Sequence, residues 1–152
     1  MKTLADSTIR RSILERLAGL RPESKGLWGR MSSHQMICHL CDSFRLAVGE
    51  KVASPATGLP QRTLVKWVAL WVPLPWPAGV PTRPEMEQGV GGTSPVEFER
   101  DRASLVTLIE RFCDRRSLGS VHPHPIFGEL RDSEWLRWGY LHADHHLRQF
   151  GA

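Results

Sequence analysis

The sequence has 152 residues, of which 41% are hydrophobic and 24% are charged. This length and balance are typical of one globular domain spanning residues 1–152, and they exclude a disordered or fibrous chain. The formal net charge is +4, but the basic residues are spread along the chain among acidic ones, so we expect no nucleic-acid partner.

Three features bear on cellular location. The N-terminal residues carry charges throughout and lack the apolar core of a secretory signal. The most apolar stretch, residues 64–81, contains Lys66 and four prolines, so it cannot form the unbroken apolar helix of about 20 residues that crosses a membrane. The three cysteines are an odd number, which argues against a disulfide framework. We therefore expect a cytoplasmic protein that does not act on a membrane.

Apolar residues recur at helical spacing in the first third of the chain. This periodicity predicts a first helix over residues 6–18. Ser32 and Gln35 have the spacing of a capping box, which predicts that a second helix starts there. Gly49 is a suitable C-terminal stop for this second helix.

Residues 50–93 have a different composition. Seven of the 11 prolines lie here, which excludes one long helix but allows a short one over residues 61–71. The segment also carries Trp67, Trp71 and Trp76. Because tryptophan is costly to leave in water, we expect this excursion to pack across the helices as a lid, and its apolar surface would suit a homodimer interface.

Two further helices are predicted after the excursion. The run Ser94–Glu97 combines an N-cap serine, a proline at the first helical position and a glutamate at the third, so a third long helix should start there. Asp132 can cap a last helix that reaches almost to the C-terminus. The pattern therefore predicts an all-α four-helix bundle with a long Pro- and Trp-rich excursion between its second and third helices.

Histidines on the last predicted helix carry the clearest chemical pattern. His142 and His146 are four residues apart, so their imidazoles lie one turn apart on the same side, where both can reach one metal ion. Trp135, Trp138 and Gln149 fall on the same face, which predicts a tryptophan-walled pocket with a polar tip.

A third ligand is available on the second predicted helix. Catalytic zinc-type sites commonly use three protein ligands and leave one position for water or substrate, and His39 is the candidate. Histidine also binds nickel, iron and copper; we expect a divalent ion, zinc or nickel. The metalloprotease motif HExxH is absent because Ala143 occupies the glutamate position, which disfavours that chemistry.

Other polar residues could join this site or orient its ligands. They are His34, Cys38, Asp42, His124, Asp144 and His145, while the role of the loop residue His122 is open. Asp42 and Asp144 could accept hydrogen bonds from the imidazoles. His145 could replace a ligand of the pair or support it. A structural ion would be closed by a fourth protein ligand such as His34, Cys38 or His124.

The cysteines have a simpler interpretation. Cys38 and Cys41 form a CxxC pair next to His39, but this spacing on a helix also suits two small core residues, and no second CxxC follows. Core packing is the favoured role for this pair and for Cys113.

Two stretches of sequence resemble a known superfamily. They are WGRMSSHQMICHLCDSFR at 28–45 and HPIFGELRDSEWLRWGYLHADHHLRQFG at 124–151. Both are similar to the DinB-like bacterial metal-binding four-helix bundles, which include bacillithiol S-transferases, and they match an uncharacterised subfamily within that group. The resemblance implies that His39, His142 and His146 bind a divalent metal.

The resemblance also implies an activity. It suggests metal-dependent transfer of a group to a low-molecular-weight thiol, with a small molecule as substrate, and a hydrolase is the related option. The alternative is a non-catalytic stress or binding protein with a structural or vestigial metal site. The superfamily typically ends HxxxHRGQ, whereas Leu147 follows His146 here and the arginine is displaced to Arg148. This shift turns the arginine by 100° around the helix and removes support for a role in holding substrate.

Overall fold

The computed structural model describes residues 1–56, 58–118 and 123–152, and over these ranges it contains helices and no β-strand, which confirms the all-α prediction. The α-helices are α1 (Ser7–Gly19), α2 (Ser33–Ala47), α3 (Lys66–Trp71), α4 (Phe98–Cys113) and α5 (Asp132–Gln149). Shorter turns lie at Gln61–Val65, Pro84–Met86 and Arg115–Ser117. No helix in the described ranges is long and apolar enough to cross a membrane.

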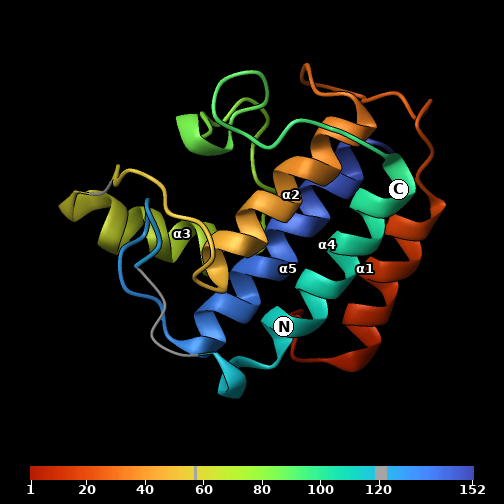
Figure 1. Cartoon of the computed structure of the whole chain (residues 1–152). Helices are drawn as coiled ribbons and strands as arrows, with labels where there is room; N and C mark the ends of the chain where they lie inside the picture. Colours follow the sequence, from red (N-terminus) through yellow and green to blue (C-terminus); the bar gives the residue numbers. More distant parts are fainter. Residues whose placement is uncertain (57, 119–122) are drawn as a thin grey trace.

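The four long helices lie side by side, and α3 stands apart from them (Figure 1). α2 packs against α4 and α5, and α1 packs against the same two helices from the other side. α3 contacts α5. The main hydrophobic core therefore lies between α1, α2, α4 and α5, and α5 has one face left over for the excursion.

α2 begins where the sequence predicts. The Ser32 side chain accepts a hydrogen bond from the Gln35 N–H, and the Gln35 side chain accepts one from the Ser32 N–H, which completes the capping box. Most of the helix is buried because neighbours cover it on several sides. Phe44, for example, is 0% exposed, and burying a side chain of this size contributes about 1.5–3 kcal/mol. His39 lies in this buried stretch.

The predicted start of the third long helix is wrong by three residues, because the N-cap is Glu97 and not Ser94. α4 begins at Phe98, and Glu97 is its N-cap, with a carboxylate that accepts hydrogen bonds from the N–H groups two and three residues later at 3.0 and 2.6 Å. Ser94 lies outside the helix. The Val96 N–H donates to the Asp101 carboxylate at 3.1 Å, which holds this segment outside the helix. Glu97 therefore caps the helix although serine is the preferred residue type at this position.

The other helix boundaries agree closely with prediction. α1 lies one residue later than predicted, and the short helix over 61–71 is present as a π-helical turn followed by α3. Asp132 is the first residue of α5 and not its cap. The cap position belongs to Arg131, whose N–H donates to the Glu134 carboxylate at 2.9 Å.

The excursion packs on α5, but not through all its tryptophans. Leu70 of α3 is fully buried and its carbonyl accepts a hydrogen bond from the Arg137 side chain of α5 at 2.9 Å. Trp71 and Trp76 are partly buried. Trp67 is 58% exposed, so the expectation that it would be covered is wrong.

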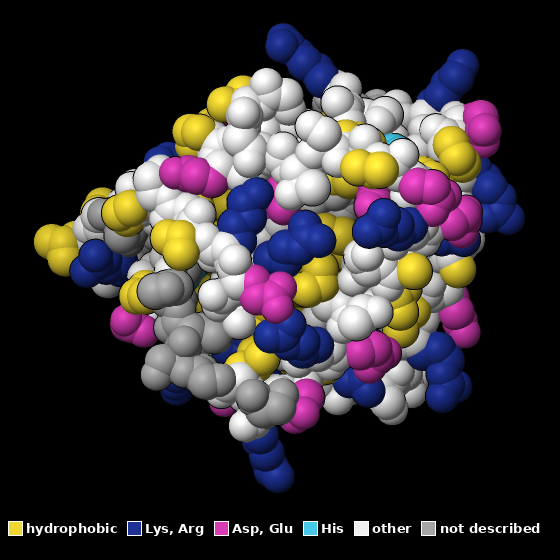
Figure 2. Space-filling model, in the orientation of Figure 1, with side chains coloured by type: hydrophobic (Ala, Val, Ile, Leu, Met, Phe, Trp, Pro, Cys, Tyr) yellow, Lys and Arg dark blue, Asp and Glu magenta, His cyan; other side chains and the backbone are white. Residues whose placement is uncertain are grey.

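Charged side chains of both signs are interspersed over the face shown in Figure 2. Ion pairs join side chains of different helices, such as Arg16 with Asp144 at 2.7 Å and Arg10 with Glu110 at 3.5 Å. These pairs are exposed or partly exposed, so each contributes about 1 kcal/mol or less. The absence of a nucleic-acid partner stays a prediction.

Candidate metal centre

Three histidine side chains from two helices converge at one point. α2 contributes His39, and α5 contributes His142 and His146. The Nε2 atom of His142 lies 3.3 Å from that of His39 and 3.2 Å from that of His146. His39 and His146 are buried and His142 is partly buried. The structure thus brings together the three residues predicted as ligands, in a group that could hold a metal ion.

Hydrogen bonds at the far side of two rings determine where their protons lie. His39 Nδ1 is 3.1 Å from the Met86 carbonyl oxygen, which only accepts, so Nδ1 carries the proton. His146 Nδ1 is 3.0 Å from Gln149 Oε1, and Gln149 Nε2 donates to the Trp28 carbonyl at 2.8 Å, which orients the amide. Both rings therefore direct an Nε2 lone pair toward His142.

Burial keeps the three imidazoles uncharged. It lowers the pKa of His39, and it lowers the pKa values of His142 and His146 well below the ordinary value. Neighbouring histidines add to the effect, because a charge on one ring disfavours a charge on the next. Neutral imidazole is the form that binds metal, so the group needs no deprotonation near pH 7.

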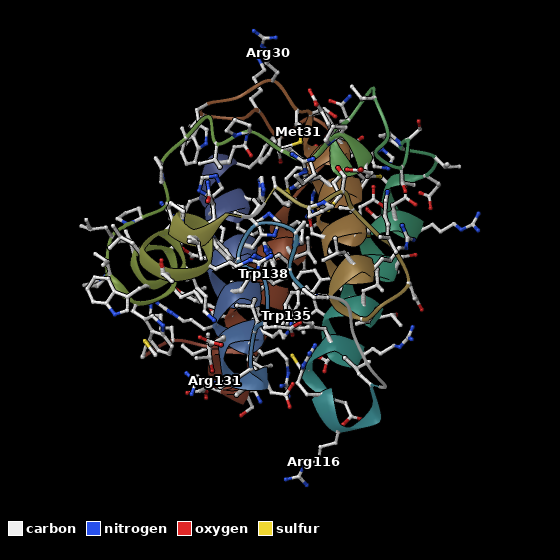
Figure 3. The ribbon with its side chains drawn as sticks, turned by 90° about the vertical axis from the view of Figure 1, so that its left-hand side faces the viewer. Arg30, Met31, Arg116, Arg131, Trp135 and Trp138 are labelled. Carbon is white, nitrogen blue, oxygen red and sulfur yellow. The ribbon has the colours of Figure 1, made fainter. Side chains whose placement is uncertain are left out.

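Tryptophans flank the ring of His142. The ring centroid lies 5.0 Å from Trp138 and 6.0 Å from Trp76, which comes from the excursion. His142 Nδ1 is buried and makes no hydrogen bond to any residue in the described ranges. Trp135 and Trp138 both project from α5 near the middle of the molecule (Figure 3), but Trp135 is 1% exposed and belongs to the core, not to the pocket wall.

A second cluster lies on the other side of α2. His34 Nε2 is 2.8 Å from Asp101 Oδ2, and Cys38 Sγ donates to the same oxygen at 3.6 Å. Neither residue joins the three-histidine group. Burial raises the pKa values of Cys38 and Cys41 to about 12, which keeps both as thiols. Their buried positions agree with the predicted packing role.

The predicted carboxylate partners of the imidazoles are wrong. Asp42 is fully buried and accepts two hydrogen bonds from Thr93, at 2.6 and 2.7 Å, while Lys51 pairs with it at 2.9 Å. Asp144 pairs with Arg16 and with Arg148. These carboxylates are engaged away from the histidines. Arg148 is also removed from the site by this pairing.

Two other histidines lie near the centre. The His145 ring is 5.1 Å from that of His146, but its nitrogens do not belong to the three-histidine group. His124 Nδ1 accepts hydrogen bonds from the N–H groups two and three residues later, at 3.1 and 3.2 Å. These hydrogen bonds use the lone pair of His124 Nδ1, so this nitrogen is not available to a metal ion. His122 lies outside the described residues.

A cavity of about 740 Å³ opens beside the three histidines. Its walls come from α3, the chain over residues 72–83, the loop over 124–127 and the loop over 28–31. Trp76 and Trp138 line it together with the histidines. A small molecule of ordinary size would fit, because ligand pockets commonly measure about 300–1,000 Å³.

The loop over 28–31 supplies a support that the sequence analysis missed. Gly29 has φ +80°, and a Cβ at this position would lie 2.4 Å from Gln149 Nε2. Only glycine combines this backbone conformation with such a close approach. The glycine lets the Trp28 carbonyl reach Gln149, which in turn holds His146. A glycine in a loop gives no sequence signal for this role.

Comparison with known proteins gives one match. A family model described as "Protein of unknown function (DUF1569)" matches residues 13–152. Neither the curated proteins nor the solved structures include a significant match to the chain. The family model covers nearly the whole chain, including all three converging histidines, and the chain therefore belongs to the DUF1569 family.

Proposed function

We propose that this protein is a DinB-like four-helix bundle that binds a divalent metal ion, zinc or nickel, through His39, His142 and His146. We further propose that it is a metal-dependent enzyme, a thiol S-transferase or a hydrolase. The bundle assignment is supported by the four long helices that lie side by side (Figure 1). The superfamily assignment is supported by the sequence stretches at 28–45 and 124–151.

The spacing of the three Nε2 atoms carries the metal proposal. Zinc bonds to histidine nitrogen at about 2.0–2.1 Å in tetrahedral geometry, which separates two ligand nitrogens by about 3.3 Å. The Nε2 atom of His142 lies 3.3 Å from that of His39 and 3.2 Å from that of His146. Because His39 and His146 both direct lone pairs into this space, the donor set fits a divalent ion.

The protein's own groups prepare the site for chemistry. The Met86 carbonyl and Gln149 hold the protons of two rings on Nδ1, which fixes the orientation of the rings. Trp76 and Trp138 pack against the ring of His142, with ring centroids 6.0 and 5.0 Å away. A divalent ion bound there supplies Lewis acidity, which lowers the pKa of a thiol or water.

Access supports the catalytic proposal over a structural ion. A structural zinc site is closed by a fourth protein ligand, whereas a catalytic site keeps one position open. In the described ranges, no fourth His, Cys, Asp or Glu joins the group. The cavity of about 740 Å³ adjoins the histidines and could admit a substrate.

Elemental analysis tests the metal proposal. The purified wild-type protein should contain close to one zinc or nickel per chain, and the double variant His142→Ala, His146→Ala should contain none. His145→Ala is the matched control, since this neighbouring histidine lies outside the group and its loss should leave the metal bound. If wild type and double variant hold equal amounts of metal, these histidines are not the ligands.

Turnover tests the enzyme proposal separately. The metal-loaded protein is incubated with electrophiles and several thiols, and with esters and amides for hydrolysis. Consumption of substrate by wild type but not by the double variant supports catalysis. A fully metal-loaded protein that turns over none of them would favour the non-catalytic binding protein.

A further inference from the structure

The cavity beside the histidines has mostly apolar walls. Apolar side chains of α3 and of the chain after it form one side, and Trp138, Met86 and Phe127 form much of the other. Leu64, in the turn before α3, and Val68 of α3 line the cavity although they are 66% and 46% exposed. They lie at its mouth, where a ligand would remove their apolar surface from water.

The charged side chains of the lining are not available inside the cavity. They are two arginines, and no acidic residue lines it in the described ranges. Arg83 donates to the backbone and side-chain oxygens of Ser54 at 3.0 and 2.6 Å. Arg30 is exposed and points away from the molecule (Figure 3).

Two uncharged polar side chains of the lining are also engaged, and the buried ring nitrogens that lack a partner in the described ranges, His142 Nδ1 and His145 Nδ1, lie at the histidine end. Ser43 donates to the His39 carbonyl at 2.9 Å, and both ends of the Gln149 amide are bonded. A peptide thiol or sugar thiol carries several charges or hydroxyls, and burying these groups without partners is costly. Away from the histidines, the described walls therefore offer few partners for the charges and hydroxyls of such a molecule.

We propose that the cavity binds an amphiphilic small molecule, with a hydrocarbon body of alkyl chain or aromatic rings and a single anionic head group. The body lies against the apolar walls, and the head lies at the three histidines, where a bound divalent ion gives a net positive charge. This inference rests on the proposed metal site and adds the class of substrate. It predicts that recognition depends on apolar surface, not on a pattern of hydrogen bonds.

A homologous series of ligands tests the inference. Calorimetric titration of the metal-loaded protein with straight-chain carboxylic acids, from acetate to dodecanoate, should show affinity rising about fourfold per methylene until the cavity is filled. A tripeptide thiol should bind more weakly than the longer acids. The metal-free protein should bind each acid more weakly than the metal-loaded protein, because the head then has no cation to contact.

A charge introduced on the cavity wall tests ligand binding separately from metal binding. Val68→Asp should weaken binding of dodecanoate by at least about tenfold, since the hydrocarbon chain of the bound acid would bury the aspartate. The metal content should stay unchanged. Val90→Asp is the matched control; Val90 is 69% exposed, lies outside the cavity lining, and its replacement should change neither quantity.

The outcomes distinguish the two proposals. Full metal content with affinity independent of chain length would overturn the substrate class and leave the metal site standing. Equal affinities with and without metal would overturn the placement of the head group. A protein that takes up no metal would refute the proposed function, and with it the position of the head at the histidines.

Discussion

Replacing Gln149 with leucine tests whether the metal site depends on the hydrogen bond behind it. Gln149 is 3% exposed and links His146 Nδ1 at 3.0 Å to the Trp28 carbonyl at 2.8 Å. Leucine has a similar size but offers neither an acceptor nor a donor. The change therefore removes the contact that orients His146 without removing a ligand.

The magnitude follows from the group that loses its partner. His146 is buried, so its Nδ1–H would remain without an acceptor, at a cost of about 1–3 kcal/mol. The ring could also turn, or move its proton to the nitrogen that should bind metal. Loss of such a partner typically lowers metal affinity by about 10–100-fold, which equals about 1.4–2.7 kcal/mol.

Competition with a chromophoric chelator measures the affinity. The expected order is wild type tightest, Gln149→Leu about 10–100-fold weaker, and His142→Ala weakest. Gln88→Leu is the matched control, because its side chain donates to the Thr93 carbonyl at 3.2 Å and makes no hydrogen bond to the histidines in the described part of the chain. Wild-type affinity in Gln149→Leu, together with loss of metal in His142→Ala, would refute the orienting role.

Three further predictions concern backbone, pH and thiols. Gly29→Ala should lower both Tm and metal affinity more than Gly79→Ala does; both glycines have φ +80°, but only at Gly29 would a Cβ collide with another side chain. Burial lowers the pKa of His124 to about 3, so the unfolded chain binds more protons below pH 6.5. The unfolding free energy of the metal-free protein should therefore fall by about 2 kcal/mol between pH 7 and pH 5 from this residue alone, as urea denaturation can measure, and a flat profile would contradict it. Cys38 and Cys41, with pKa values of about 12, should resist alkylation in the native protein at pH 8 and react after unfolding, as mass spectrometry can show.

Local signals predicted most of the helices. The capping box at Ser32 and the apolar periodicity of α5 depend on residues close together in sequence, and both helices start within one residue of prediction. The start of α4 could not be predicted in the same way. Ser94 is the preferred cap by residue type, but Glu97 caps the helix. Asp101 accepts a hydrogen bond from the Val96 N–H and also contacts His34 of α2, which is distant in sequence.

Only the part of the candidate site that depends on sequence spacing could be predicted. The spacing of His142 and His146 places them on one face of α5, and His39 could be nominated as the remaining partner. The Met86 carbonyl could not be found, because any residue has a carbonyl and its position depends on how the excursion folds back. The chosen carboxylates, Asp42 and Asp144, were chemically suitable but have other partners.

The excursion contributes to the metal site as well as to the cavity. Its Met86 carbonyl orients His39, its Trp76 packs against His142, and α3 forms one wall of the cavity. Arg137 of α5 holds α3 through the Leu70 carbonyl at 2.9 Å. In the proposed metal site, ion binding and packing of the excursion would therefore be thermodynamically linked, since an ion that prefers the oriented rings also stabilises the contacts that orient them. With the excursion detached, the three histidines would remain on their helices, but His39 would lose the acceptor that directs its lone pair to the site, and the cavity would lose a wall.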